Sequence, residues 1–227
     1  MIERALILAA GRGERMRPLT DTTPKPLLAV GGKPLIAHHL EKLARAGVRE
    51  VVINTSHLAG RFPEALGDGS RWNLRIHYSY EGPEPLETGG GMLRALPLLG
   101  AAPFIAVSAD IVSDFDYATL PEEPAGLAHL VMVPNPDFLP RGDFWLDGAW
   151  LNEDGAGERL TFGNIGVYRP EIVAAETAAR FKLLPMYQRA MRERRLTGER
   201  YDGFWANLGT PAQLAEADEL FRRRATE

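Results

Sequence analysis

The sequence contains no cysteine among its 227 residues. This absence excludes a disulfide framework, a thiol nucleophile and a zinc–thiolate site. Long hydrophobic runs are also missing, since no stretch reaches the roughly 18 apolar residues that a membrane-spanning helix needs. Charges at Glu3 and Arg4 precede an apolar run that is too short for a signal peptide. We therefore expect a cytoplasmic protein without a membrane partner.

An excess of positive charge is absent as well. The formal net charge is −4, so no broad basic field is available for nucleic acid, which is not expected as a partner. The five histidines do not occur at metal-ligand spacing. No linker, repeat or obligate protein partner is evident, and we expect a single domain over residues 1–227.

The first 26 residues carry the clearest chemical signal. A short apolar run over 4–10 has no helical spacing and predicts a buried parallel strand. Gly11 and Gly13 follow, and glycines at this point allow backbone N–H groups to approach a phosphate closely. The cationic residues of the same region are Arg12, Arg15, Arg17 and Lys25. Together these features predict a clamp for a polyphosphate.

Two other interpretations of this loop are open. It could be a glycine-rich turn with solvated arginines. The dinucleotide-binding fingerprint, which would indicate a nicotinamide-dependent oxidoreductase, fits poorly because it needs a third glycine and a helix opening directly from the loop. Instead Pro18, Pro24 and Pro26 predict a long irregular segment, and no Gly-Lys-Ser/Thr sequence of a Walker A motif follows.

Helical and extended patterns alternate through the first half of the chain. A helix is predicted after Pro34, a buried strand over 51–54, a helix over 57–66 and an extended segment over 74–80. This rhythm predicts an α/β fold, a Rossmann-like and mostly parallel mixed sheet with helices on both faces.

A run of three glycines, Gly89 to Gly91, lies in the first turn of another predicted helix, with Thr88 as its N-cap. Each glycine costs a helix about 1 kcal/mol relative to alanine. The run therefore indicates either a loose loop or a backbone that approaches a planar base or a sugar closely.

Asp110 follows a predicted buried strand over 104–108. It would stand at the strand edge where α/β sheets bind ligands, although a plain loop cap is the alternative. Further on, Gly163 and Asn164 interrupt an extended run over 160–168, which indicates either ligand contact or a bulged edge strand. Thr210 and Gln213 form a capping box for the last helix, with Pro211 in its first position.

The opening motif resembles that of the sugar-phosphate nucleotidyltransferases. The matching residues are Leu8-Ala9-Ala10-Gly11-x-Gly13-x-Arg15-Met16-x-Pro18-Leu19-Thr20 and Pro24-Lys25-Pro26-Leu27. The resemblance implies transfer of a nucleotidyl group from UTP to a sugar 1-phosphate. It implies Arg15, Lys25 and Asp110 as catalytic residues. The nucleotide-binding residues that it implies are Ala9, Ala10, Gly11, Gly13, Arg15, Lys25, Asn54 and Gly89.

The same resemblance implies a Mg²⁺ cofactor held by Asp110 and Asn207. Many members of the family carry aspartate where this chain has Asn207, and Ala109 replaces a usual glycine. A site with one carboxylate would leave much of the metal binding to the substrate phosphates. The departures beside the chemistry motivate an alternative, a catalytically weakened nucleotide-binding homologue.

Several later segments resemble one branch of the family, whose members act on N-acetylmuramic acid 1-phosphate. They are Pro85–Gly91, Leu96–Gly100, Gly126–Val131, Arg141–Phe144 and Phe181–Leu183. The sugar-binding residues implied are Glu87, Asp143, Asn164 and Lys182. Residues from about 1 to 125 would form the nucleotide-binding half and residues from about 126 to 227 the sugar-binding half. The alternative substrate is another sugar 1-phosphate, of the glucose or mannose type.

Overall fold

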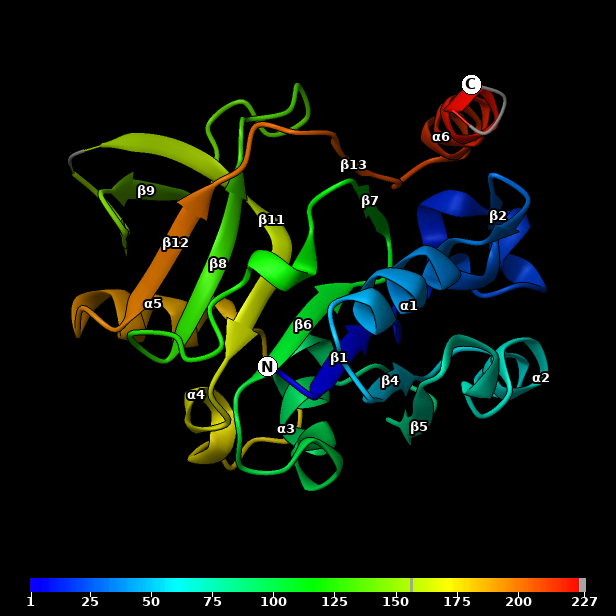
Figure 1. Ribbon diagram of the computed structural model, residues 1–227, viewed down its shortest axis with the longest axis horizontal. Coiled ribbons are helices and arrows are strands. Elements are labelled where there is room, and N and C mark those ends of the chain that lie inside the picture. The colour runs from blue at the N-terminus through cyan, green and yellow to red at the C-terminus, as the bar shows by residue number, and fades with distance from the viewer. Residues whose placement is uncertain (156, 225–227) are drawn as a thin grey trace.

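The computed structural model describes residues 1–155 and 157–224. Within them the main feature is a nine-stranded mixed sheet (Figure 1). Its strands are, in order across the sheet, β5 (Arg75–Tyr80), β4 (Glu50–Thr55), β1 (Arg4–Leu8), β6 (Phe104–Ser108), β11 (Glu158–Tyr168), β8 (Ala128–Val133), β12 (Leu196–Arg200), β10 (Trp150–Asn152) and β9 (Phe144–Asp147). The buried apolar strand predicted at the start of the chain is β1, which is central in this order.

The sheet is parallel in one part and largely antiparallel in the other. β5, β4, β1 and β6 are all parallel, as the helix–strand rhythm of the first half predicted. β11 runs antiparallel to both β6 and β8, and β9 and β10 form an antiparallel hairpin. The expectation of a mostly parallel sheet therefore holds only for the first half, because in the second half β11, β9 and β10 pair antiparallel and only β8 and β12 pair in parallel.

Helices cover both faces of the sheet. They are α1 (Leu35–Arg45), α2 (Arg61–Leu66), α3 (Glu87–Leu99), α4 (Glu171–Ala174), α5 (Leu184–Arg192) and α6 (Pro211–Arg224). Successive residues of a strand point to opposite faces. Ile7 of β1 accordingly packs in one cluster with Leu40 of α1, whereas Leu6 packs in another with Met92 of α3. Among the described residues, no helix is both long and apolar enough to cross a membrane.

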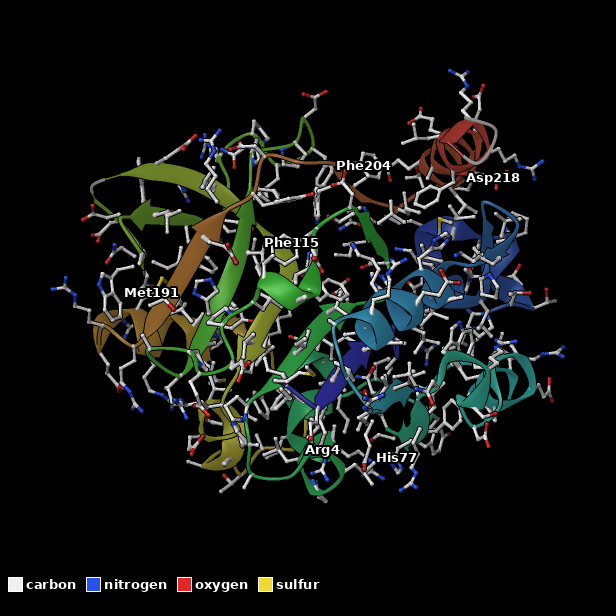
Figure 2. The ribbon with its side chains drawn as sticks, viewed as in Figure 1. Arg4, His77, Phe115, Met191, Phe204 and Asp218 are labelled. Atoms are coloured by element: carbon white, nitrogen blue, oxygen red, sulfur yellow. The ribbon has the colours of Figure 1, made fainter. Side chains whose placement is uncertain are left out.

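Short elements complete the fold. They are the strand pairs β2 (Ala29–Val30) with β3 (Lys33–Pro34) and β7 (Ile111–Ser113) with β13 (Trp205–Asn207), and the 3₁₀ turns η1 (Glu14–Met16), η2 (Leu19–Asp21), η3 (Lys25–Leu27), η4 (Ser70–Trp72) and η5 (Tyr117–Thr119). The last helix, α6, returns to the N-terminal segments, where Gly31 N–H donates to Asp218 Oδ1 at 2.7 Å (Figure 2). The last helix thus packs against the segment that contains β2 and β3.

Three local predictions need correction. The helix predicted over 57–66 begins only at Arg61. Thr88 is not an N-cap, because α3 begins at Glu87 and the Thr88 hydroxyl accepts the Leu183 N–H at 3.0 Å. Asn164 does lie at a bulge, but β11 is a central strand rather than an edge. The capping box at Thr210 is confirmed, with Gln213 N–H donating to the Thr210 hydroxyl at 3.3 Å.

Candidate active site

A cavity of about 820 Å³ lies where β1, β4 and β6 end. The carboxyl ends of these parallel strands meet at one edge of the sheet, which is where open α/β sheets bind ligands. Of the predicted nucleotide-binding residues, those that line the cavity are Ala9, Ala10, Gly11, Gly13, Arg15, Lys25 and Asn54. Asp110, predicted to be catalytic, lines it too.

Gly13 is needed for the conformation of the loop after β1. Its φ is +64°, and a Cβ there would lie 2.9 Å from Thr20 Cγ2 and 3.2 Å from Lys25 Cβ. The Gly13 carbonyl accepts the Met16 N–H at 2.8 Å and the Thr20 hydroxyl at 2.9 Å, so the loop is fixed by its own bonds. Gly11 has nothing within 4 Å of its Cβ position and faces open space. The loop thus leaves room for a ligand beside its backbone.

Three of the four predicted cations line the cavity, namely Arg12, Arg15 and Lys25. Lys25 is 8% exposed, and its Nζ donates to Asp110 Oδ2 at 2.9 Å. The Arg15 guanidinium lies against Gly209, where a Cβ would come within 3.1 Å of it. Arg17 is the exception, since it is exposed and pairs with Asp21 outside the cavity.

Asp110 and Asn207 are brought together by the strand pair β7–β13. Asn207 stands opposite Ile111, and Leu208 N–H donates to the Asp110 carbonyl at 2.8 Å. Asn207 Oδ1 is buried and accepts no hydrogen bond from the described residues. A buried carbonyl oxygen without a donor fits a hard cation, which prefers oxygen ligands. The backbones of Asp110 and Asn207 are adjacent, but Asn207 lines another cavity, of about 450 Å³, and is not in the lining of the one that contains Asp110. No group of three His, Asp or Glu side chains that could hold a metal exists in residues 1–155 and 157–224.

Asn54 is buried at the end of β4 and connects two walls of the cavity. Its Oδ1 accepts the Ala9 N–H at 2.5 Å, and its Nδ2 donates to Glu81 Oε1 at 2.5 Å. Glu81 is 6% exposed, and burial raises the pKa of its carboxyl group. Sequence reasoning missed Glu81, because a single glutamate in a loop shows no pattern.

The three-glycine run does not approach a ligand with its backbone. Gly89 is buried, does not belong to the cavity lining, and donates its N–H to the Phe181 carbonyl at 2.9 Å. A Cβ at Gly89 would lie 2.4 Å from the Phe181 ring, and one at Gly90 would lie 2.2 Å from the Ala179 carbonyl oxygen. These glycines instead allow the segment before α5 to pack directly on α3, so Gly89 is not placed to contact a nucleobase.

A second cavity, of about 430 Å³, adjoins the first. All four predicted sugar-binding residues line it, namely Glu87, Asp143, Asn164 and Lys182. The residues shared by both linings are Leu8, Glu87, Thr88 and Ser108. This second cavity takes walls from both halves of the chain, with Glu87 from the first half and Asp143, Asn164 and Lys182 from the second.

Two of these residues have a left-handed backbone, Glu87 with φ +63° and Asn164 with φ +58°. Such a conformation is costly for glutamate and is retained mainly at functional sites. Asp143 is fixed by the Phe162 N–H, which donates to its Oδ2 at 2.8 Å, while burial raises the pKa of its carboxyl group. Lys182 is exposed and has no ion-pair partner among the described residues. The second cavity therefore offers hydrogen-bonding groups and one available cation.

Comparison with known proteins finds related sequences over almost the whole chain. The sequence profile of the family described as nucleotidyl transferase matches residues 4–133. The N-acetylmuramate alpha-1-phosphate uridylyltransferase of Neisseria meningitidis serogroup B is 47% identical, over 96% of this chain and 97% of that protein. The protein of the same name from Caulobacter vibrioides is 35% identical, over 94% of this chain and 97% of its own length.

Solved structures show the same fold. A crystal structure of a UDP-glucose pyrophosphorylase complexed with UDP-glucose superposes with a TM-score of 0.76 and covers 99% of this chain and 100% of that one. Its sequence identity is 20%, so the likeness concerns the fold.

Proposed function

The chain belongs to the nucleotidyl transferase family, and from this premise we propose that it transfers the uridylyl group of UTP to N-acetylmuramic acid 1-phosphate, releasing pyrophosphate. The two relatives that carry this activity in their names match almost the whole chain. The substrate assignment rests on this likeness, together with the sugar-binding residues that line the second cavity.

One structural observation supports this proposal most strongly. The Lys25–Asp110 pair lies in the larger cavity, and that cavity shares part of its wall with the one lined by Glu87, Asp143, Asn164 and Lys182. A triphosphate against the glycine loop would then meet a sugar phosphate near the shared wall. Holding the two reactants in this way replaces a bimolecular encounter by a positioned one.

The proposed reaction requires neutralisation of the negative phosphate charges more than it requires a general base. The second pKa of a phosphate monoester lies near 6, so the attacking phosphate oxygen is already an anion at neutral pH. It would attack the α-phosphorus of UTP in line, and pyrophosphate would leave. Arg15 and the N–H groups of the glycine loop would bind the triphosphate, and Lys25 would neutralise the phosphates that approach each other.

Mg²⁺ is the cofactor that we infer, held by Asp110 and by the donorless Oδ1 of Asn207. When bound, it would supply positive charge to phosphate oxygens. Because the protein offers one carboxylate and one amide oxygen, substrate phosphates would complete the coordination. Asp110 Oδ2 also accepts a hydrogen bond from Lys25 Nζ at 2.9 Å.

A catalytically weakened homologue is the alternative that Ala109 and Asn207 suggested, and the structure bears on Ala109. Ala109 is not among the described non-glycine residues with positive φ, and its N–H donates to the Leu8 carbonyl at 3.0 Å. The backbone at this position therefore does not require a glycine, and this departure gives little support to the weakened form.

A grid of nucleoside triphosphates against sugar 1-phosphates, measured by pyrophosphate release with Mg²⁺, tests the proposal. We expect UTP with N-acetylmuramic acid 1-phosphate to have the highest kcat/KM. A higher value for glucose or mannose 1-phosphate would reject the substrate assignment. Nucleotide binding without turnover across the grid would favour the weakened homologue.

A further inference from the structure

Glu81 is a buried carboxylate with both oxygens engaged. Oε1 accepts from Asn54 Nδ2 at 2.5 Å, and Oε2 accepts the Leu86 N–H at 2.7 Å. Asn54 Oδ1 in turn accepts the Ala9 N–H at 2.5 Å. We call this chain of bonds, from Leu86 through Glu81 and Asn54 to Ala9, the relay. It connects the loop before α3, strand β4 and the loop after β1, all of which border the larger cavity.

The relay has a donor at each end, the N–H of Leu86 and the N–H of Ala9. An asparagine amide has one accepting and one donating end, so its carbonyl faces Ala9 only if its NH₂ group faces an acceptor. An ionised carboxylate accepts at both oxygens and therefore fixes this orientation. The charge of Glu81 thus determines which way the Asn54 amide points.

We propose that Glu81 is a positioning residue of the nucleotide site, which orients Asn54 and through it fixes the Ala9 backbone against which the nucleobase binds. The inference rests on the proposed function, and it further takes the base to lie beside Ala9 and Ala10, which the family resemblance implies as nucleotide-binding residues and which line the larger cavity. Glu81 itself acts through its two protein partners, Asn54 and Leu86.

The third glycine of the run gives independent support. A Cβ on Gly91 would lie 2.3 Å from Glu81 Oε1 and 2.6 Å from Asn54 Nδ2. Gly91 lies inside α3, where a glycine weakens a helix relative to alanine. Glycine at position 91 therefore lowers the stability of α3, but it leaves room for the buried carboxylate of Glu81 at the edge of the larger cavity.

The test begins with Glu81→Gln. The glutamine NH₂ group must face either Asn54 Nδ2 or the Leu86 N–H, so one bond of the relay is replaced by two opposed donors. We expect the Kd and the KM for UTP to rise about tenfold or more. The kcat and the KM for the sugar phosphate should change by less than about threefold, a split that general destabilisation would not produce.

A double variant, Glu81→Gln with Asn54→Asp, again pairs a donor with an acceptor at every bond of the relay. The glutamine oxygen then accepts the Leu86 N–H, its NH₂ group donates to the introduced aspartate, and the other aspartate oxygen accepts the Ala9 N–H. Asn54→Asp alone opposes two carboxylates and should also weaken UTP binding. The double variant should recover a UTP Kd within about threefold of wild type, which is a coupling that a double-mutant cycle measures.

Thermal unfolding of all four proteins shows which of them fold. An unchanged UTP Kd in folded Glu81→Gln would overturn the inference. So would a folded double variant that binds UTP no better than the single variants, and this second result decides the matter if Glu81→Gln does not fold. Because Kd is measured without a sugar phosphate, a wild type that binds UTP but does not turn over contradicts only the proposed function. A wild type that binds no UTP contradicts both.

Discussion

At the scale of single residues, the site depends on one partly buried ion pair, Lys25 with Asp110. Lys25 is nearly buried and Asp110 is about one third exposed, with 2.9 Å between Nζ and Oδ2. A pair of this kind stabilises the fold little, because both groups lose hydration on burial. Its value is that it holds a cation and a potential metal ligand at the place where two anionic substrates would meet.

Asp110→Asn keeps the size of the side chain and removes its charge. We expect kcat to fall about 10²- to 10³-fold, because the group that would hold the cation and orient Lys25 is lost. Pyrophosphate release at saturating substrates measures this effect. Asp137→Asn, on an exposed loop, is the matched control and should keep full activity. A kcat for Asp110→Asn within about threefold of wild type would remove Asp110 from the mechanism.

His39 gives a pH prediction. It is 2% exposed, its Nδ1 lies 2.8 Å from the Tyr117 hydroxyl, and burial lowers the pKa of the imidazole from 6.5 to about 3. Between these two values the unfolded chain binds a proton that the folded chain does not. Stability is therefore fully present above pH 6.5 and is lost as the pH falls towards 3, by at most about 1.4 kcal/mol per pH unit.

Urea unfolding of wild type and His39→Gln at pH 8, 7, 6, 5 and 4 checks this slope. The two proteins should differ by a constant free energy of unfolding above pH 6.5. Below it, the wild type should lose stability more steeply than the variant. Parallel curves over the whole range would show that His39 does not titrate as its burial requires.

At the scale of elements, two glycines of α3 allow a segment from the second half of the chain to pack directly on this helix. The segment that carries Lys182 packs on α3 only because Gly89 and Gly90 have no side chain. Glycine at these positions lowers the intrinsic stability of α3. The absence of side chains there lets the segment that contains Lys182, which lines the second cavity, lie directly on α3.

Gly90→Ala tests this packing. Alanine is the better helix former by about 1 kcal/mol, yet its Cβ would come within 2.2 Å of the Ala179 carbonyl oxygen. We expect a net destabilisation of about 1–3 kcal/mol and a higher KM for the sugar phosphate. Gly60→Ala, where nothing lies within 4 Å of the Cβ position, should leave both values nearly unchanged. Stabilisation by Gly90→Ala would mean that the close contact is not maintained in solution.

The individual elements differ in how well the sequence alone predicts them. The strand before Gly11, the loop and the strand-end Asp110 were predictable because each has a local pattern. The place of Asn207 beside Asp110 was expected only from resemblance, since no local pattern tells which distant strand pairs with β7. The packing of Gly89 and Gly90 against the segment 179–181 was not predictable, because the sequence shows what a glycine costs but not which neighbour requires it. Glu81 had no local signal at all.

At the scale of the whole molecule, the two halves form one body. β6 of the first half pairs with β11 of the second, and α6 returns to the N-terminal hairpin β2–β3. The shared sheet gives neither half a complete core of its own, since the cluster that contains Leu6 also contains Leu130 and Tyr168.

We therefore expect one cooperative unfolding transition in urea. Far-ultraviolet circular dichroism reports on the whole sheet, while tryptophan fluorescence reports on four residues, Trp72 before β5, Trp145 in β9, Trp150 in β10 and Trp205 in β13. Both probes should give the same midpoint, which is the test of two-state behaviour. Separate transitions would indicate that the two halves of the chain fold independently.

The central claim is that UTP and N-acetylmuramic acid 1-phosphate are the substrates that meet at Lys25 and Asp110. A competition experiment tests it most directly: UTP labelled in its α-phosphate is given to the enzyme with Mg²⁺ and equal concentrations of N-acetylmuramic acid 1-phosphate and glucose 1-phosphate. The ratio of labelled products equals the ratio of the two kcat/KM values. We predict that the label appears in the UDP-linked muramic acid in about tenfold excess or more, the discrimination that a difference of 1.4 kcal/mol gives. Equal labelling of both sugars, or a preference for glucose, would contradict the account.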